Sequence, residues 1–507
     1  MYSEVISAAV CGVESRLILV EADVANGLPG FSMVGFLSSE VREAQDRVRT
    51  AIYNSGVRLE AKKVTVNLAP GDIRKSGSGF DLPIAVAVLA AYGVIPRDSI
   101  KETFFAGELG LDGRVNKIRG ILGMVMEARK AGCRSCVLPK GNAPEGAVIE
   151  GIQILGAGSL REVMDHFNGA AQIKETVSNI EEKFQQGEER AKLDFADIRG
   201  QRLVKRAIEI AAAGMHNILI SGPPGCGKSM MAKRIPTILP PLSKEEALEV
   251  SRIYSVAGLL PEAGLVTRRP FRMPHHTISG AAMAGGGFVP GPGEISFAHR
   301  GVLYLDELPE YQSEVLEVLR QPMEDGRVIL SRGGGTYIFP CEFMLAASRN
   351  PCKCGYYPDR SRCRCTQGEV ERYLHRISRP LLDRIDLHVE AEPVKYQELT
   401  GEKQEETSEE IRERVQKARQ RQQERYRGTA LRFNRDLTPA LLEEYCPLGE
   451  EERRLTEEVY RKKDLTARSF HRLLKVSRTI ADLEGSRDIQ SRHISEALLY
   501  RPVRQLM

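Results

Sequence analysis

The sequence predicts an α/β protein of several domains, with a parallel sheet and a helical C-terminal part. Three observations lead to this class. The chain has 507 residues, which is more than one hydrophobic core normally holds. Short runs such as Asn217–Ile220 and Gly301–Leu305 are almost wholly apolar, as in parallel strands buried on both faces. Beyond residue 430, apolar side chains recur at helical spacing.

The composition excludes several classes of protein. Hydrophobic residues make up 42% and charged residues 28%, as in ordinary globular proteins. The net charge of +4 neither demands nor excludes nucleic acid, and the absence of Trp disfavours base stacking on aromatic platforms. No signal peptide and no apolar run of membrane-spanning length is found. We therefore expect a cytoplasmic protein with no membrane partner.

Residues 1–167 form the first predicted domain, which alternates strands and helices. Residues 168–192 follow as a polar linker with some helix. The elements expected in the first domain are strands at Leu17–Val24, Val64–Leu68, Thr103–Leu109 and Ser135–Leu138, and helices at Ser38–Asn54 and Ile121–Ala131.

The second predicted domain spans residues 193–395, and a helical C-terminal domain spans residues 396–507. Within the latter, residues 402–427 are highly charged and carry only a thin apolar stripe at Ile411, Val415 and Ala418. We interpret that segment as a solvated helix. A later helix has one marked face, formed by Phe470, Leu473, Leu474, Ser477 and Ile480.

A glycine-rich loop follows the strand at Asn217–Ile220 and precedes a helix. It has the G-x-x-x-x-G-K-[ST] pattern of a phosphate-binding P-loop, in the strand–loop–helix setting that this motif needs. Its backbone N–H groups would surround phosphate oxygens, Lys228 would neutralise the β- and γ-phosphates, and Ser229 would ligate Mg²⁺. The predicted ATP-binding residues are Gly222, Pro223, Pro224, Gly225, Cys226, Gly227, Lys228 and Ser229.

Two carboxylates, Asp306 and Glu307, end the apolar strand Gly301–Leu305. Such a pair alone is a weak signal, but after a P-loop it indicates a Walker B motif. Asp306 would hold Mg²⁺ through water, and Glu307 would orient and deprotonate the attacking water. The sequence therefore predicts an enzyme that hydrolyses ATP.

Longer motifs around these residues resemble the YifB/ComM family of magnesium-chelatase-like AAA+ ATPases, over nearly the whole chain. The resemblance implies a homo-hexameric ring with an AAA+ core and a helical lid. The motifs that carry it are Arg272–Thr277, Pro292–Ser296, Leu319–Gly326, Asn350–Gly355 and Pro380–Asp386.

The same resemblance implies further catalytic roles. Asn350 would be sensor 1, although Arg349 replaces the small apolar residue or Met that the family pattern has before Asn-Pro-Cys. Arg384 resembles an arginine finger, which would reach the ATP of a neighbouring subunit. Arg468 resembles sensor 2, and Arg472 and Arg478 are rivals for that role.

Two inserted loops are expected near a central pore. The segment between Lys228 and Asp306 exceeds the roughly 60 residues of two βα units, and the surplus around Phe288 and Val289 looks like the helix-2 insertion of this group of motors. Arg327–Phe339 reads as a β-hairpin with Arg332 at its tip. Arg332 would contact a phosphate backbone, or it is an ordinary solvated arginine.

Four clustered cysteines, Cys352, Cys354, Cys363 and Cys365, fit tetrahedral Zn²⁺. Their C-x-C spacing is tighter than the common C-x₂-C, so free thiols and disulfides remain alternatives. The neighbouring basic residues would offset thiolate charge or touch phosphate; they are Lys353, Arg360, Arg362 and Arg364.

The first domain resembles the proteolytic domain of Lon, a fold shared with ribosomal protein S5 and the C-terminal domain of RadA, at Gly107–Val115 and Val137–Lys140. Aligning the motifs places Gly79 and Leu122 where Lon has its Ser–Lys dyad. Ser78 and Lys117 are near but out of register, so we expect no peptidase activity.

For the whole chain the resemblance implies a DNA-translocating ATPase that migrates branches of recombination intermediates in natural transformation. Two alternatives share the ATPase core. A magnesium-chelatase subunit is disfavoured by the lack of a D-x-S-x-S metal-adhesion motif and of a long acidic linker. The other is a protein remodeller or Lon-like protease.

Overall fold

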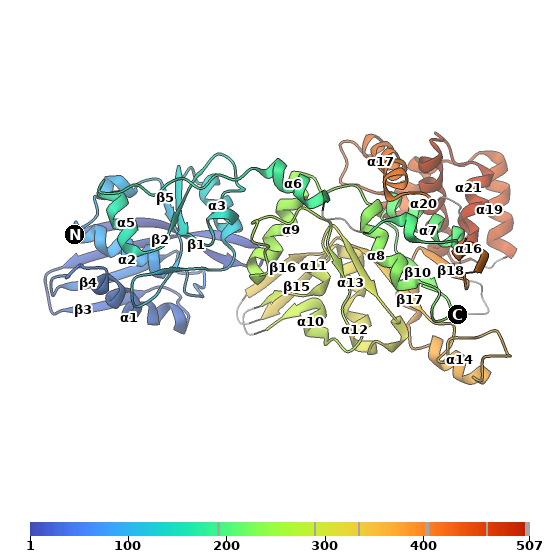
Figure 1. Ribbon diagram of the computed structural model, residues 1–507, viewed down its shortest axis with the longest axis horizontal. Helices are drawn as coiled ribbons and strands as arrows, with labels where there is room; N and C mark the ends of the chain where they lie inside the picture. Colours follow the sequence, from blue (N-terminus) through green and yellow to red (C-terminus); the bar gives the residue numbers. More distant parts are fainter. Residues whose placement is uncertain are drawn as a thin grey trace. The chain divides into compact units, whose positions relative to one another are not determined.

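The computed structural model describes residues 1–189, 193–287, 290–332, 335–394, 396–400, 405–462 and 465–501. The chain divides into two compact units, each built from three chain segments. The first unit contains Met1–Gly187, Ser243–Thr267 and Ser331–Phe339. The second contains Glu188–Leu242, Arg268–Leu330 and Pro340–Met507. Elements are labelled in Figure 1.

A seven-stranded mixed sheet forms the centre of the first unit, in the order β3-β4-β2-β1-β5-β8-β9. β1 pairs antiparallel with β2 and β2 with β4, whereas β1-β5, β5-β8 and β8-β9 are parallel. The strands are β1 (Tyr2–Cys11), β2 (Glu14–Ala25), β3 (Gly30–Val34), β4 (Lys63–Ala69), β5 (Thr103–Phe105), β8 (Ser135–Pro139) and β9 (Gln153–Ala157), with β6 (Glu108–Leu109) and β7 (Val115–Asn116) as a separate ribbon.

The first unit also contains helices, several of which pack on this sheet. α2 (Asp81–Ala91) is buried at every position, because its sequence is apolar almost all round, and it is the unit's central helix. Ser38 caps the amphipathic α1 (Ser39–Asn54) through the backbone N–H of Val41. The others are α3 (Ile121–Lys130), α4 (Ala143–Gly146), α5 (Leu160–Phe167), α6 (Ile180–Glu189), which extends past Gly187, and α9 (Lys244–Ala257).

The α9 segment is joined to the first unit by hydrogen bonds as well as by packing. Ser255 in α9 donates to the buried carboxylate of Glu145, and its carbonyl accepts from the N–H of Gly120 at 3.1 Å. Arg252 donates to the carbonyl of Val13 at 3.0 Å. Residues distant in sequence therefore complete the N-terminal fold.

The second unit is built on a five-stranded sheet whose order is β11-β14-β17-β10-β18. All its strand pairs are parallel, as the apolar runs predict. The strands are β10 (Ile218–Ser221), β11 (Phe271–Arg272), β14 (Val302–Leu305), β17 (Met344–Arg349) and β18 (Leu387–Glu390). Because parallel strands end at one edge, the loops after β10, β14 and β17 meet there.

The chain also forms shorter elements outside the two large sheets. The predicted hairpin is present as β15 (Arg327–Arg332) and β16 (Gly335–Pro340). A small ribbon pairs β12 (Gly285–Gly286) with β13 (Gly291–Pro292). The helices are α7 (Arg202–Gly214), α8 (Lys228–Ile238), α10 (Gly280–Ala284), α11 (Glu294–Phe297), α12 (Ser313–Val318), α13 (Arg320–Asp325), α14 (Gln367–Leu374), α15 (Arg379–Leu382) and α16 (Tyr396–Thr400).

The C-terminal region is helical, as expected. Its helices are α17 (Ser408–Arg425), α18 (Pro439–Tyr445), α19 (Glu450–Lys462), α20 (Ala467–Glu484) and α21 (Ser491–Leu499). The interpretation of α17 as a solvated helix is wrong for one of its faces. Val415 and Ala418 are fully buried against the second unit's core, and Gln422 on the same helix donates to the carbonyl of Ala213 at 3.1 Å. Among the described residues, no helix is long and apolar enough to cross a membrane.

Candidate nucleotide and metal sites

The predicted P-loop joins β10 to α8 at the edge where the parallel strands end. Gly225 and Gly227 have φ of 80° and 85°, a left-handed conformation that glycine adopts without strain. Gly227 caps α8 without a side-chain hydrogen bond, so the first-turn N–H groups of α8 remain available to an anion. The loop therefore has the backbone geometry that phosphate binding requires.

Lys228 is buried at the base of this loop. Its Nζ donates to the carbonyls of Gly222 at 2.8 Å and Pro223 at 3.0 Å, and to Oδ1 of Asn350 at 3.0 Å. Asn350 follows β17, which pairs in register with β10. The structure thus brings the predicted phosphate-binding lysine and the predicted sensor 1 into direct contact.

Asp306 follows β14 and accepts three side-chain hydrogen bonds. Ser229 and Tyr304 each donate at 2.8 Å, and Ser348 also donates to this carboxylate. Burial alone would raise the pKa of Asp306, but these donors hold it below its ordinary value. A hydroxyl and an ionised carboxylate are oxygen donors of the kind that Mg²⁺ prefers, so Ser229 and Asp306 fit the ion.

Glu307 adopts a left-handed backbone with φ of 52°, which is uncommon for a residue with a side chain. Its N–H donates to Oγ of Ser348 at 3.1 Å, so one hydroxyl positions both residues of the acidic pair. Strained backbone of this kind concentrates at functional sites. The sequence analysis missed Ser348 and Tyr304; the available signal was a hydroxyl group in each of two mainly apolar strands.

Arg384 and Arg468, from different elements, converge on one carboxylate. Arg384 lies 2.6 Å from Glu324, and Arg468 lies 3.8 Å from the same side chain. Arg384 also donates to the carbonyl of Pro380 at 2.7 Å. In the described part of the chain, neither arginine has a hydrogen bond or ion pair with the P-loop or with the acidic pair after β14.

The two rivals of Arg468 are held in the interior of the second unit. Arg472 donates to the carbonyl of Ile385 at 2.8 Å and pairs with Asp383 at 3.2 Å. Arg478 is 1% exposed and pairs with Asp482. The side chain of Arg468, by contrast, is 56% exposed. Among these three, Arg468 is therefore the arginine that a phosphate outside the core can reach.

Arg349, the residue that departs from the family pattern, is anchored to the strand before the P-loop. Its Nε donates to Oγ of Ser221 at 2.9 Å, and its carbonyl accepts from the N–H of Gly222 at 3.1 Å. Burial lowers the pKa of this guanidinium. The long side chain is thus accommodated between β17 and β10.

The four clustered cysteines come together in the loop between β17 and α14. Their sulfur atoms all lie within 4.8 Å of one another, with separations of 3.3 Å for Cys352–Cys354, 3.5 Å for Cys354–Cys363 and 3.7 Å for Cys352–Cys363. Tetrahedral zinc with Zn–S bonds of about 2.3 Å places its sulfurs roughly 3.8 Å apart. The donor set and its spacing therefore fit one zinc ion.

The predicted pore loops fall partly outside the described residues. Phe288 and Val289 lie outside them, between β12 and β13, and so does the side chain of Arg332. The role of these residues in contacting a substrate stays a prediction.

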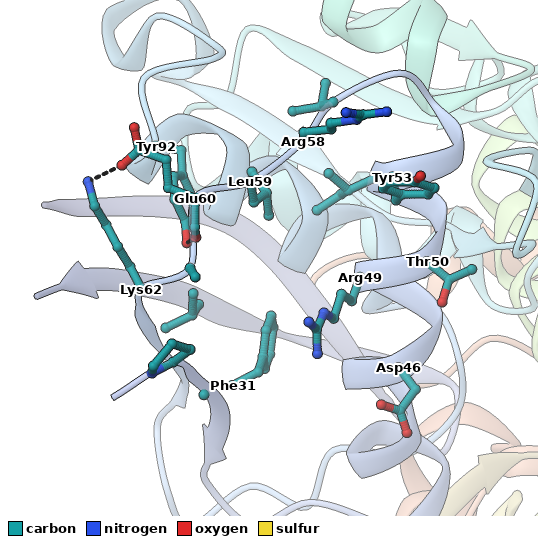
Figure 2. A pocket seen from close by; sticks show the side chains of 16 residues that line it. Phe31, Asp46, Arg49, Thr50, Tyr53, Arg58, Leu59, Glu60, Lys62 and Tyr92 are labelled. Atoms are coloured by element: carbon teal, nitrogen blue, oxygen red, sulfur yellow. Dashed lines mark hydrogen bonds and ion pairs between the residues drawn. The ribbon is translucent and has the colours of Figure 1, made fainter. Parts of the chain in front are cut away.

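A cavity of 720 Å³ lies in the first unit, beside α1 and the segment that leads into β4. Figure 2 shows Arg49 and Tyr53 extending from α1, and Arg58 and Lys62 from the following segment. Lys62 is paired with Glu60 at 2.7 Å, whereas Arg49 and Arg58 have no ion pair within the described chain. The cavity therefore combines two guanidinium groups that lack an ion pair in the described chain with an exposed aromatic ring and the carboxylates of Asp46 and Glu60.

The region compared with the Lon dyad has other hydrogen bonds. Ser78 donates to the carboxylate of Glu108. The nearby Asp81 is fully buried and binds Arg47 through two nitrogens, at 2.9 and 3.0 Å. The absence of peptidase activity stays a prediction.

Comparisons with known proteins cover almost the whole chain. Three family descriptions match: "Subunit ChlI of Mg-chelatase" at residues 20–142, "Magnesium chelatase, subunit ChlI" at residues 194–399, and "Magnesium chelatase, subunit ChlI C-terminal" at residues 405–501. The "Magnesium-chelatase 67 kDa subunit" of Chlorobaculum tepidum is 30% identical over 161 residues, which cover only 31% of this chain and 23% of that protein.

Two relatives match end to end. "Competence protein ComM" of Haemophilus influenzae is 40% identical over 505 residues, covering 99% of this chain and 98% of that protein. YifB of Escherichia coli is 40% identical over 503 residues, covering 98% and 97%. Together with the P-loop and the acidic pair at the edge of a parallel sheet, these matches show that the chain belongs to the ComM/YifB family of magnesium-chelatase-like AAA+ ATPases.

Proposed function

We propose that this protein forms a hexameric ring in the cytosol, hydrolyses ATP and uses the energy to move DNA, with branch migration of recombination intermediates in natural transformation as its task. The observation that carries the proposal is the end-to-end match to a protein named for competence, over 99% of this chain. The contacts around Lys228, Asp306 and Asn350 supply the motor's chemistry.

In this proposal, residues 222–229 bind the phosphates of ATP, and Ser229 and Asp306 hold Mg²⁺. Bound Mg²⁺ would neutralise charge that develops on the phosphate oxygens. Glu307, fixed through its N–H by Ser348, takes the proton of the attacking water. Asn350 orients that water while its side chain keeps Lys228 in the loop.

Arg384 and Arg468 act on the nucleotide of a neighbouring subunit. Their shared contact with Glu324 supports a common target, because two guanidinium groups that gather on one carboxylate within a chain are also placed to gather on one phosphate. A site completed by a neighbour requires a head-to-tail interface, which gives a ring when the rotation between subunits closes.

DNA contacts are assigned to two places. One is the β15–β16 hairpin with Arg332 at its tip. The other is the cavity of the first unit, where Arg49 and Arg58 have no ion pair in the described chain and where, with Lys62, they outnumber the carboxylates of Asp46 and Glu60. Phosphate groups are the ligands that unpaired guanidinium groups bind most readily. As part of the same proposal, the four cysteines of residues 352–365 hold one zinc ion.

The alternative is a chelatase-type ATPase subunit, which would insert a metal into a tetrapyrrole. The family descriptions favour it by name, but the chelatase relative matches only 31% of this chain. The two functions can be distinguished by which molecule stimulates ATP hydrolysis. A DNA motor responds to branched DNA, and a chelatase subunit responds to its chelatase partner.

The test is ATP-dependent migration of synthetic three- and four-way junctions. We expect the wild-type protein to migrate these junctions. Lys228→Ala should lose both nucleotide binding and migration. Glu307→Gln should bind ATP but not hydrolyse it. Equal migration by wild type and Lys228→Ala would refute the motor. Hydrolysis that branched DNA leaves unchanged would refute DNA as the substrate.

A further inference from the structure

The four-cysteine loop lies directly against the ATP-binding residues. Cys352 follows Asn350 by two residues, and Asn350 accepts the hydrogen bond from Lys228 at 3.0 Å. Gly355, the residue after Cys354, packs on the P-loop: a Cβ added to Gly355 would lie 2.4 Å from Cδ of Pro224. Two separate contacts therefore join the cysteines to the nucleotide site.

A third connection runs through α14. Thr366, the residue after Cys365, caps this helix in a reciprocal pair with Glu369, so the cysteine loop sets where α14 begins. Tyr373, near the end of α14, packs in one small cluster with Cys352 and Cys363.

Beyond α14, Arg376 donates to the carboxylate of Glu310 at 3.0 Å. Glu310 lies in the turn that follows Glu307. The loop and its helix thus reach the segments that carry both sensor 1 and the proposed catalytic carboxylate.

The apolar core beneath this loop is small. It consists of a few side chains around the sulfurs, namely Val370, Tyr373 and Leu374 with Cys352 and Cys363. Such a cluster buries too little apolar surface to fix a loop that carries many charges. A metal ion would supply the missing cross-links, as in other small domains with four thiolates.

The surroundings also suit thiolates. The N–H of Tyr357 points at Sγ of Cys352 at 3.4 Å, and Arg360 donates to the carbonyl of Cys365 at 2.8 Å. Arg362 lies 3.9 Å from the ring centre of Tyr356. Four thiolates on one Zn²⁺ carry a net charge of −2, which these hydrogen bonds and guanidinium groups offset.

We propose that one Zn²⁺ bound by Cys352, Cys354, Cys363 and Cys365 positions the ATPase site, holding Asn350 from one side and the P-loop from the other. The inference rests on the proposed ATP hydrolysis and on no property of DNA. The cysteines are positioning residues, because none of them contacts the nucleotide-binding side chains except through Asn350, Gly355 or α14.

Metal content is the first measurement. Full-length protein from zinc-supplemented cells is analysed by mass spectrometry, and we expect one zinc per chain. Cys363→Ser should lose it, whereas Cys11→Ser, at a cysteine in the other unit, should keep it. Protein that is folded and hydrolyses ATP at full rate without zinc would overturn the proposal.

Gly355→Ala tests the coupling without touching a ligand. We expect zinc to stay at one per chain while kcat for ATP falls about tenfold, the scale seen when groups supporting a metal site are displaced. Gly428→Ala is the matched control, because Gly428 has a similar φ of 83° against 87° for Gly355, but an added Cβ there meets nothing within 4 Å.

Three further outcomes bear on the proposal. Equal kcat for Gly355→Ala and Gly428→Ala would refute the coupling, even with zinc present. In wild type, removal of zinc with an organomercurial and a chelator should lower kcat, and thiol reductant plus zinc should restore it. Failure of junction migration with zinc dependence of ATP hydrolysis intact would refute only the DNA function.

Discussion

At the scale of single residues, Ser348 is the most informative position to mutate, because its hydroxyl is hydrogen-bonded to both Asp306 and Glu307. Ser348→Ala removes the donor to Asp306 and the acceptor for the N–H of Glu307. We expect kcat to fall about tenfold, since hydrogen bonds to charged groups contribute roughly 1.5–3 kcal/mol. Ser296→Ala is the control, because the Ser296 hydroxyl is buried without a partner in the described structure. Equal kcat in both variants would contradict the assignment.

The same variant has a pH signature. Hydrogen bonds hold the pKa of Asp306 below its ordinary value, so this carboxylate stays charged as the pH falls. Removing one donor raises that pKa, and the acidic limb of the kcat/KM profile should therefore move to higher pH. An unmoved limb with a lower kcat would indicate that Ser348 acts through Glu307 alone.

Arg49 and Arg58 test the proposed DNA contact in the first unit. The double variant Arg49→Ala/Arg58→Ala should bind branched DNA more weakly, and its affinity should depend less steeply on salt, by about two in the log–log slope. ATP hydrolysis without DNA should be unchanged. Lys62→Ala is the comparison, because Lys62 is already paired with Glu60. An unchanged salt slope in the double variant would remove the cavity from the DNA path.

Residue types in a fixed pattern made much of the nucleotide site predictable. The P-loop and the acidic pair need particular residues at particular spacings, so their positions follow from the sequence. Ser348 and Tyr304 could not be found in that way, because each fits an apolar strand and acquires meaning only when β14 and β17 pair. The meeting of Arg384 and Arg468 on Glu324 likewise depends on tertiary contacts.

At the scale of elements, α17 shows where pattern reasoning fails. Its sequence is so highly charged that a solvated helix was the natural interpretation, yet one narrow face is fully buried. Arg419 is part of that face and donates to the carbonyl of Ala212 at 2.6 Å. Long side chains of this kind bury their stems while their polar ends find partners. Elements with stronger periodicity were predicted more closely: α1 begins within one residue of its predicted start and ends where predicted, and β2 extends the predicted strand Leu17–Val24 by three residues at its start and one at its end.

This packing predicts a sharp contrast within α17. Val415→Ala leaves a gap in the core of the second unit and should cost about 2 kcal/mol. Lys417→Ala, on the exposed side two residues away, should cost almost nothing. Thermal unfolding monitored by calorimetry measures both. Equal changes in unfolding temperature for the two variants would support the interpretation of α17 as a solvated helix.

At the scale of the whole molecule, the central prediction is that each ATP site is shared between neighbours. Lys228→Ala subunits keep Arg384, and Arg384→Ala subunits keep the P-loop, so a mixed ring contains some complete sites. With random neighbours about a quarter of the interfaces are complete, and ATP hydrolysis should recover to roughly that fraction. A mixture of Lys228→Ala and Glu307→Gln subunits should not recover. Both residues belong to the subunit that binds the ATP, so every site in such a ring contains one of the two defects. Absence of recovery in the first mixture would place Arg384 in its own subunit's site.

The three-segment make-up of the first unit has a consequence for biosynthesis. Residues 243–267 and 331–339 belong to it, and Ser255 supplies a hydrogen bond to Glu145. A ribosome that has just released residue 187 has therefore not yet made all the parts of the N-terminal fold. The first unit can therefore finish folding only after residue 339 has left the ribosome, by which point much of the second unit has also been made. The two units then fold together during translation rather than one after the other.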